Sequence, residues 1–411
     1  MSDPGPDLDP APSRWFDLLV AAAVGAGLLL LSELLVPGAE QPFAGHGERF
    51  ATMAEDPFAR TGDFPQRLLW PLLAWLFAKV GVSAVAFSQV CNALLLAVVF
   101  WFVLRRTGQF VDGLLVAAVV ACSGAVLVYK PMACMSDPLS LLTFVLLVHF
   151  ARRGAVFWPL VFVSALSHEM VFFFWPWLLY LRCRNGGAWW RDGAFLGITL
   201  AAYLAFRVQT TASYGTSYYL EKAFWFPWCM PAMWGLWAFV VLVEFGPLLT
   251  VVAWGLGRRG ALSAREALGG RWGGWLYLAG VLPLMILAYD VMRFATFAFL
   301  PVVLAATALV RRRGGRLLVA ALLAAAIPCY AWLHPVPSQQ GGRHFTEISA
   351  HIYSLLPGRV VPRQPMALEH AWTFSLELLG RWWWPLGTAA LLALLSMLAL
   401  GWVLRLRFPP R

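Results

Sequence analysis

The chain has 411 residues, of which 60% are hydrophobic and 13% are charged, whereas charged residues make up about 25% of a typical soluble domain. Apolar runs recur along its whole length, which excludes a large soluble domain and predicts a polytopic α-helical membrane protein. The net charge of +10 does not indicate nucleic-acid binding, because the basic residues form short clusters between apolar runs, as cytoplasmic loops do.

The first apolar run follows a short segment rich in proline and aspartate. We expect residues 1–14 to be disordered and cytoplasmic. Trp15–Val36 is then the first membrane span, since it lacks the small-residue cleavage site of a signal peptide. This orientation places Gly38–Arg67 on the outer side. That loop has three arginines and five carboxylates, namely Glu40, Glu48, Glu55, Asp56 and Asp63.

The next apolar run, Leu68–Val80, has 13 residues and contains Pro71. It is short for a membrane span, so we expect a helix that lies on the outer surface. This choice places every later arginine pair on the cytoplasmic side, as the positive-inside rule requires. The remaining single spans are predicted at Ser83–Leu104, Val111–Tyr129, Pro138–Phe150, Gly193–Phe206, Met230–Leu256, Trp275–Tyr289, Ala295–Val310, Leu317–Trp332 and Trp383–Leu404.

The segment between Arg153 and Arg182 does not fit a single crossing, because arginines flank it at both ends. We predict two short helices, Ala155–Leu166 and Met170–Leu181, that meet at Ser167–Glu169. Irregular backbone at membrane depth is tolerated where it is buried in protein or lines a cavity. The predicted fold is therefore all-α: a polytopic membrane protein with roughly 12 membrane helices, two of them short and paired, and surface helices in the first outer loop.

Three stretches of the first half of the chain resemble the C-type (GT-C) membrane glycosyltransferases. They are GHGERFATMAEDPF and FPQRLLWPLLAWLF in and after the acidic loop, and ALSHEMVFFFWPW on the paired short helices. Glu48 stands where that family commonly has Asp, and His168 where it commonly has Lys or Arg. The resemblance covers residues 15–210, which we expect to form a catalytic transmembrane module; residues 211–411 form a variable C-terminal transmembrane module.

The resemblance implies transfer of a sugar from a polyprenyl-phosphate donor to a glycan, lipid or protein acceptor. The reaction takes place at the periplasmic face of a bacterial inner membrane, with both termini of the enzyme in the cytoplasm. Membrane lipids are the expected surroundings and nucleic acid is not an expected partner. The sequence shows no metal-ligand spacing, and dependence on a divalent cation is left open.

Such a reaction needs a carboxylate that accepts the proton of the acceptor hydroxyl, and cations that stabilise the departing phosphate. Glu48 is our first candidate for the base, and the adjacent pair of Glu55 and Asp56 is the competing site. Arg67 and Arg293 are the candidates for the phosphate, because arginine presents a planar fork that suits phosphate oxygens. Arg67 as an interfacial anchor, and the carboxylates as parts of a solvated loop, are the alternatives.

His168 and Glu169 carry the polar centre of the paired short helices. Ionisable residues at membrane depth are costly and are candidates for function by default. We expect this pair to bind an acceptor hydroxyl, relay a proton or help to hold a metal, although a His–Glu dipeptide alone is not a metal site, since adjacent residues on a helix point about 100° apart. The alternative is a satisfied polar cap where the two half-helices meet.

Four further charged residues on the outer side are candidates for contacts with the substrate. Asp290 and Arg293 are three residues apart, so a local ion pair is the structural alternative. Lys130 and Asp137 flank another outer loop and are candidates for contact with the lipid phosphate.

Two other classes of function remain open from the sequence. A flippase or transporter of lipid-linked sugars would use the same membrane charges as a substrate path, although transporters often show inverted repeats and none is evident here. A catalytically degenerate membrane scaffold is the third possibility.

Overall fold

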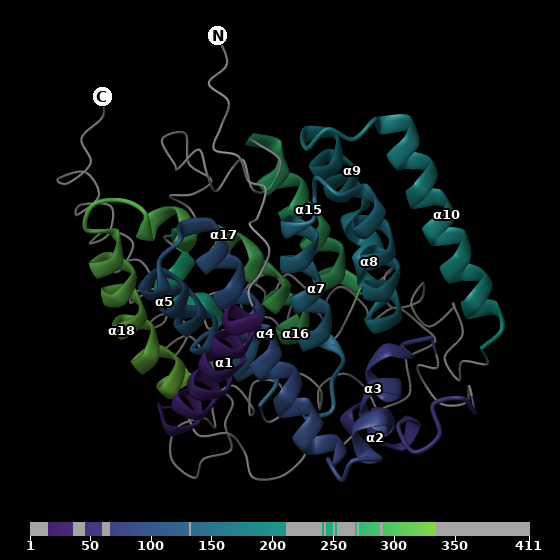
Figure 1. Cartoon of the computed structure of the whole chain (residues 1–411), viewed down its shortest axis with the longest axis horizontal. Coiled ribbons are helices and arrows are strands. Elements are labelled where there is room, and N and C mark those ends of the chain that lie inside the picture. The colour runs from purple at the N-terminus through teal and green to yellow at the C-terminus, as the bar shows by residue number, and fades with distance from the viewer. Residues whose placement is uncertain are drawn as a thin grey trace, which may run out of the picture.

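The computed structural model describes residues 15–35, 46–59, 66–130, 133–210, 241, 244–249, 251–252, 268, 271–287 and 291–333 (Figure 1). These ranges are helical and contain no strand, which confirms the all-α class. Among the described residues, three stretches are long and apolar enough to cross a membrane: α1 (Trp15–Leu35), α4 (Ala84–Thr107), and Arg293–Val310, which includes α17 (Phe299–Val310).

The other described helices do not meet both criteria of length and apolar composition. The α-helices are α2 (His46–Met53), α3 (Leu69–Ala78), α5 (Phe110–Ala121), α6 (Gly124–Leu127), α7 (Asp137–His149), α8 (Gly154–Ser167), α9 (Trp175–Arg184), α10 (Trp189–Val208), α15 (Arg271–Leu287), α16 (Val291–Ala295) and α18 (Gly315–Leu333). Three short 3₁₀ helices are η1 (Glu169–Phe174), η2 (Gly246–Leu248) and η3 (Thr296–Ala298). The predicted span Trp383–Leu404 and most of Met230–Leu256 lie outside the described residues.

Burial distinguishes the helices at the centre of the bundle from those at its edge. The buried share of the apolar window is 94% for Arg293–Val310, 61% for α4 and 22% for α1. Large apolar side chains are exposed on α1 and on α10, which lies at the edge of the bundle in Figure 1. Exposed apolar surface of this kind suits contact with lipid.

Helix α1 packs closely on α4 because Gly25 lacks a side chain. A Cβ atom at Gly25 would lie 2.4 Å from the carbonyl oxygen of Ala93, which is closer than any real contact. Small residues at such crossings allow two membrane helices to pack backbone against backbone. Gly25 therefore sets the distance between α1 and α4.

Two predicted segments differ in detail from the structure. The predicted span Val111–Tyr129 is interrupted, because α5 ends at Ala121 and α6 starts only at Gly124. Gly124 faces the side chain of Glu244, whose Cγ would lie 2.5 Å from an added Cβ. The predicted helix Met170–Leu181 begins as the 3₁₀ turn η1, and α9 starts at Trp175 with a proline in its first turn.

The arginine clusters between helices gather at one end of the bundle. A guanidinium nitrogen of Arg105, at the end of α4, lies 3.8 Å from the carboxylate of Asp17, at the start of α1. Arg106 is within electrostatic reach of Arg152 and Arg311. Helices α2 and α3 lie at the opposite end (Figure 1). The bundle thus has an arginine-rich end and a second end that carries the predicted outer helices.

Candidate functional site

Five of the predicted site residues lie together at the end of the bundle that carries α2 and α3. They come from the segment before α3, the start of α7, the junction of α8 with η1, and α16. All are buried except Glu169, whose side chain is 16% exposed. We call this group the charged cluster; its members are Arg67, Asp137, His168, Glu169 and Arg293.

The first ion pair of the charged cluster joins Arg67 to Glu169. The Nε atom of Arg67 donates to Oε2 of Glu169 at 2.9 Å, and its Nη2 atom donates to Oε1 at 2.7 Å. This bidentate geometry uses both oxygens of the carboxylate and is the strongest form of such a contact. The pair ties the head of α3 to the break between α8 and α9.

The second ion pair joins Asp137 to Arg293, with 2.6 Å between Oδ2 and Nη2. Asp137 is the first residue of α7 and is fully buried. A carboxylate at that position also interacts favourably with the positive end of the helix dipole. The hydroxyls of Tyr129 and Thr296 both donate to the carbonyl of Arg293, at 3.1 and 2.5 Å, and so hold the turn that carries this arginine.

The ring of His168 lies between the two carboxylates. Its extended backbone, with φ −158° and ψ 123°, ends α8. The Nε2 atom is 3.9 Å from Oδ1 of Asp137, and Nδ1 is 3.5 Å from Oε2 of Glu169. Among the described residues, neither ring nitrogen has a hydrogen-bond partner, and neither has Oδ1 of Asp137. Since buried polar atoms are nearly always bonded, these three mark a place for a polar group.

The charges of the cluster balance. Two guanidinium groups face two carboxylates, so with a neutral imidazole the formal charge is zero. Buried charges are tolerated when they are paired in this way. A ligand phosphate that binds either arginine therefore competes with a carboxylate that already neutralises it.

A ladder of hydroxyl groups joins α7 to α8 beside the cluster. Ser140 donates to Ser167 at 3.0 Å, Ser167 to the carbonyl of Ser136 at 2.9 Å, and Thr143 to Ser164 at 2.7 Å. The sequence reasoning did not identify these residues. Their spacing by three or four positions on two consecutive apolar helices is the signal that would have found them, since such residues hydrogen-bond between membrane helices.

Three carboxylates of the acidic loop, those of Glu48, Glu55 and Asp56, are exposed at the same end of the molecule. Glu48 lies in the first turn of α2, and Glu55 and Asp56 lie in the turn that follows this helix. Helix α2 packs on α3 through the buried rings of Phe50 and Trp70, whose centroids are 6.3 Å apart. These three carboxylates thus form a rim on the solvent side of α2 rather than part of the charged cluster.

The two remaining predicted site residues are not members of the cluster in the described structure. The ammonium of Lys130 donates to the carbonyl of Ser32 at 2.9 Å and pairs with Glu33, so it fastens the end of α1. Burial lowers the pKa of Lys130, an effect that Glu33 opposes. Asp290 lies outside the described residues.

Within the described ranges, no group of three or more histidine, cysteine, aspartate or glutamate side chains is arranged to hold a metal ion. No protein-family model, curated protein or solved structure matches the chain.

Proposed function

We propose that the protein is a membrane glycosyltransferase that moves a sugar from a polyprenyl-phosphate donor to an acceptor at the periplasmic face of a bacterial inner membrane. The observation that carries this proposal is the charged cluster. It brings two buried arginines, Arg67 and Arg293, to the end of the bundle whose surface carries the exposed carboxylates of α2.

The arginines bind and orient the phosphate of the donor. Each guanidinium is held in a fixed direction by a carboxylate, Glu169 for Arg67 and Asp137 for Arg293. A donor phosphate takes the place of a carboxylate oxygen at one of these forks. The negative charge that develops on the departing phosphate is stabilised by the same guanidinium.

The acceptor hydroxyl loses its proton to a carboxylate of the acidic rim, with Glu48 as first candidate and Glu55 or Asp56 as the alternative. The acceptor oxygen forms a bond to the anomeric carbon as the bond from that carbon to the phosphate oxygen breaks. The electron pair of the broken bond leaves with the lipid phosphate. The unbonded nitrogens of His168 hold a sugar or acceptor hydroxyl between the two carboxylates.

The arrangement of the two ends supports the proposed orientation. Arg105, Arg106 and Arg152 lie at the end of the bundle away from α2 and α3. Cytoplasmic loops are enriched in arginine. The charged cluster would then face the periplasm, and the N-terminus the cytoplasm.

The balanced charge of the cluster favours a scaffold as the second candidate function. Both buried arginines already have carboxylate partners, and together they tie four segments of the bundle. A protein without catalytic activity would need these ion pairs only to hold its helices in place. A flippase of lipid-linked sugars is the third outcome that an experiment must separate.

Full-length protein in liposomes with polyprenyl-phosphate [¹⁴C]glucose or [¹⁴C]mannose, and with bacterial envelope extract as the source of acceptor, separates these functions. We expect label to leave the donor and enter a product. Glu48→Gln should lower the rate about 100-fold, in line with loss of a general base. Asp17→Asn, a change at the opposite end of the bundle, is the control and should keep the rate.

Three results would redirect the proposal. If Glu55→Gln or Asp56→Asn abolishes transfer while Glu48→Gln does not, the base is the adjacent pair. If all three variants stay active, the acidic rim takes no part in the chemistry. Label that crosses the bilayer while still on its donor identifies a flippase. If the label is neither transferred nor moved across the bilayer, the protein is a scaffold.

A further inference from the structure

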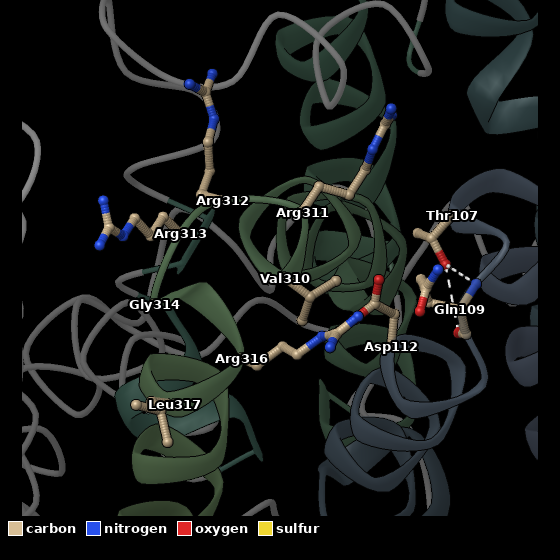
Figure 2. A pocket seen from close by; sticks show the side chains of 10 residues that line it. All are labelled: Thr107, Gln109, Asp112, Val310, Arg311, Arg312, Arg313, Gly314, Arg316 and Leu317. Carbon is tan, nitrogen blue, oxygen red and sulfur yellow. Dashed lines mark hydrogen bonds and ion pairs between the residues drawn. The ribbon is translucent and has the colours of Figure 1, made fainter.

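The arginine-rich end of the bundle contains a pocket of about 560 Å³ (Figure 2). It lies between two helix-to-helix turns, one that joins α4 to α5 and one that joins α17 to α18. The pocket is remote from the charged cluster and plays no part in the proposed glycosyl transfer. Its lining residues are Thr107, Gln109, Asp112, Val310, Arg311, Arg312, Arg313, Gly314, Arg316 and Leu317.

The lining of the pocket has an excess of positive charge. The lining contains four arginines and a single carboxylate, that of Asp112, which accepts a hydrogen bond from the Nε atom of Arg316 at 2.6 Å. The other three, Arg311, Arg312 and Arg313, are exposed, and no described residue forms an ion pair with them. In Figure 2 they extend from the turn after α17 in different directions, while Arg316 points to Asp112.

Apolar side chains lie directly beside these cations. Leu317, on the first turn of α18, lines the pocket and is 72% exposed. Phe110 and Val111, at the start of α5 next to the pocket residue Gln109, are each 47% exposed. A ligand that fits this surface carries a negative group for the arginines and a hydrocarbon part for the exposed apolar residues.

We propose that this pocket binds the phosphate headgroup of an anionic phospholipid. Guanidinium forks suit phosphate oxygens, and basic pockets between membrane helices on the cytoplasmic side are known to hold such headgroups. The acyl chains lie along the exposed apolar residues of α5 and α18. Arg311, Arg312 and Arg313, which form no ion pair with a described residue, supply the charge that the phosphate needs, while Arg316 is held by Asp112.

The proposal can be tested with full-length protein in neutral detergent, by titration with dioleoylphosphatidylglycerol and detection of bound lipid by native mass spectrometry. Dioleoylphosphatidylcholine, with the same chains and no net charge, should bind at least about 10-fold more weakly. The double variant Arg312→Gln/Arg313→Gln should lower the affinity for phosphatidylglycerol about 25-fold, which is about 5-fold for each arginine. The matched control is Arg152→Gln/Arg153→Gln, two exposed arginines at the same end that do not line the pocket.

A second variant is expected to gain affinity, a result that a misfolded protein would not give. Asp112→Asn removes the carboxylate that holds Arg316, so this guanidinium becomes available to phosphate. We expect Asp112→Asn to raise the affinity for phosphatidylglycerol several-fold. No effect of Asp112→Asn, together with equal losses in the two double variants, would show that the lipid senses only diffuse surface charge and would overturn the site.

The soluble headgroup distinguishes the two sources of phosphate. Glycerol 1-phosphate, titrated under the same conditions, should compete with phosphatidylglycerol only at concentrations at least about 100-fold higher, because it lacks the apolar part. Competition at equal concentration would show that the acyl chains add no affinity, and that the pocket recognises a phosphate group rather than a lipid. Equal binding of phosphatidylcholine would show that the headgroup charge is not recognised.

Discussion

Replacement of Arg67 by methionine tests whether the charged cluster holds the bundle together. Methionine keeps much of the length of the arginine side chain but removes the charge and both hydrogen bonds to Glu169. The carboxylate of Glu169 then remains in a largely buried place, with its side chain 16% exposed, and has lost its bidentate partner. Removal of one member of a buried ion pair is strongly destabilising for this reason.

We expect Arg67→Met to lower the free energy of unfolding by about 3–5 kcal/mol. Glu169→Gln on its own should also destabilise, since it leaves the Arg67 guanidinium with a neutral partner. The double variant should cost less than the sum of the two single changes, by about 0.5–3 kcal/mol, because each single change already breaks the pair. Lys79→Met is the control, since Lys79 is exposed on the far turn of α3, where its ammonium lies 4.8 Å from the ring of Trp75. Loss of the contact between Lys79 and Trp75 should lower the free energy of unfolding by about 0.5–1 kcal/mol.

The measurement is reversible unfolding in mixed micelles of a mild detergent and sodium dodecyl sulfate, followed by tryptophan fluorescence. Unfolding free energies for the wild type, the two single variants and the double variant complete the cycle. Additive effects of the two changes, within about 0.5 kcal/mol, would refute the pairing of Arg67 with Glu169. A cost for Lys79→Met as large as that for Arg67→Met would show that burial of the charge is not the cause.

Three further predictions concern the frame and the centre of the site. Gly25→Val should lower the free energy of unfolding by about 1–3 kcal/mol, because the added side chain overpacks α1 against α4. Gly27→Val is the control and should not lower it, because nothing lies within 4 Å of a Cβ at Gly27. The same unfolding assay compares the two variants. His168→Phe should change stability by less than about 1.5 kcal/mol, because no described residue hydrogen-bonds the ring, and a larger loss would reveal a buried partner. A cysteine at Gln109 should react with a membrane-impermeant maleimide only from the cytoplasm, and one at Asp63 only from the periplasm; labelling of Gln109 from outside would invert the proposed orientation.

Local patterns in the sequence predicted the elements that carry the candidate site. The 13-residue run Leu68–Val80 contains α3, and the start of the predicted span Ser83–Leu104 is the N-cap of α4, where Ser83 accepts a hydrogen bond from Ala86. The polar tripeptide Ser167–Glu169 predicted a break between two short helices, and α8 does end there. These features depend on neighbouring residues, which is why sequence reasoning reached them.

Partners that are distant in the sequence were not predicted. The spacing of Asp290 and Arg293 suggested a local ion pair as the alternative to function, and it gave no sign of the bond from Arg293 to Asp137, 156 positions away; Asp290 lies outside the described residues. Arg67 and Glu169 were both selected as ionisable groups, but their contact across 102 positions has no local signature. The sequence identifies charges that are costly to bury, and only the packing of the helices determines which of them neutralise one another.

The interruption between α5 and α6 has a similar cause. An apolar run from Val111 to Tyr129 has the length and composition of one span, and no residue in it forbids a continuous helix. Gly124 follows the break and lies against the side chain of Glu244, which comes from a segment 120 positions later. A long-range contact of this kind overrides a local preference, so the position of the break was not predictable from the run itself.

The arginines at the two ends of the molecule differ in burial and pairing, so their replacement should affect stability differently. In the charged cluster the guanidiniums are buried and balanced by carboxylates, so their removal acts first on the stability of the bundle. Around the pocket, Arg311, Arg312 and Arg313 are exposed, and their removal should cost little stability. A ligand that binds the pocket adds charge pairs to a frame that is already complete. A ligand that binds the cluster competes with the carboxylates already bound to the arginines, so its affinity depends on the ion pairs that it replaces.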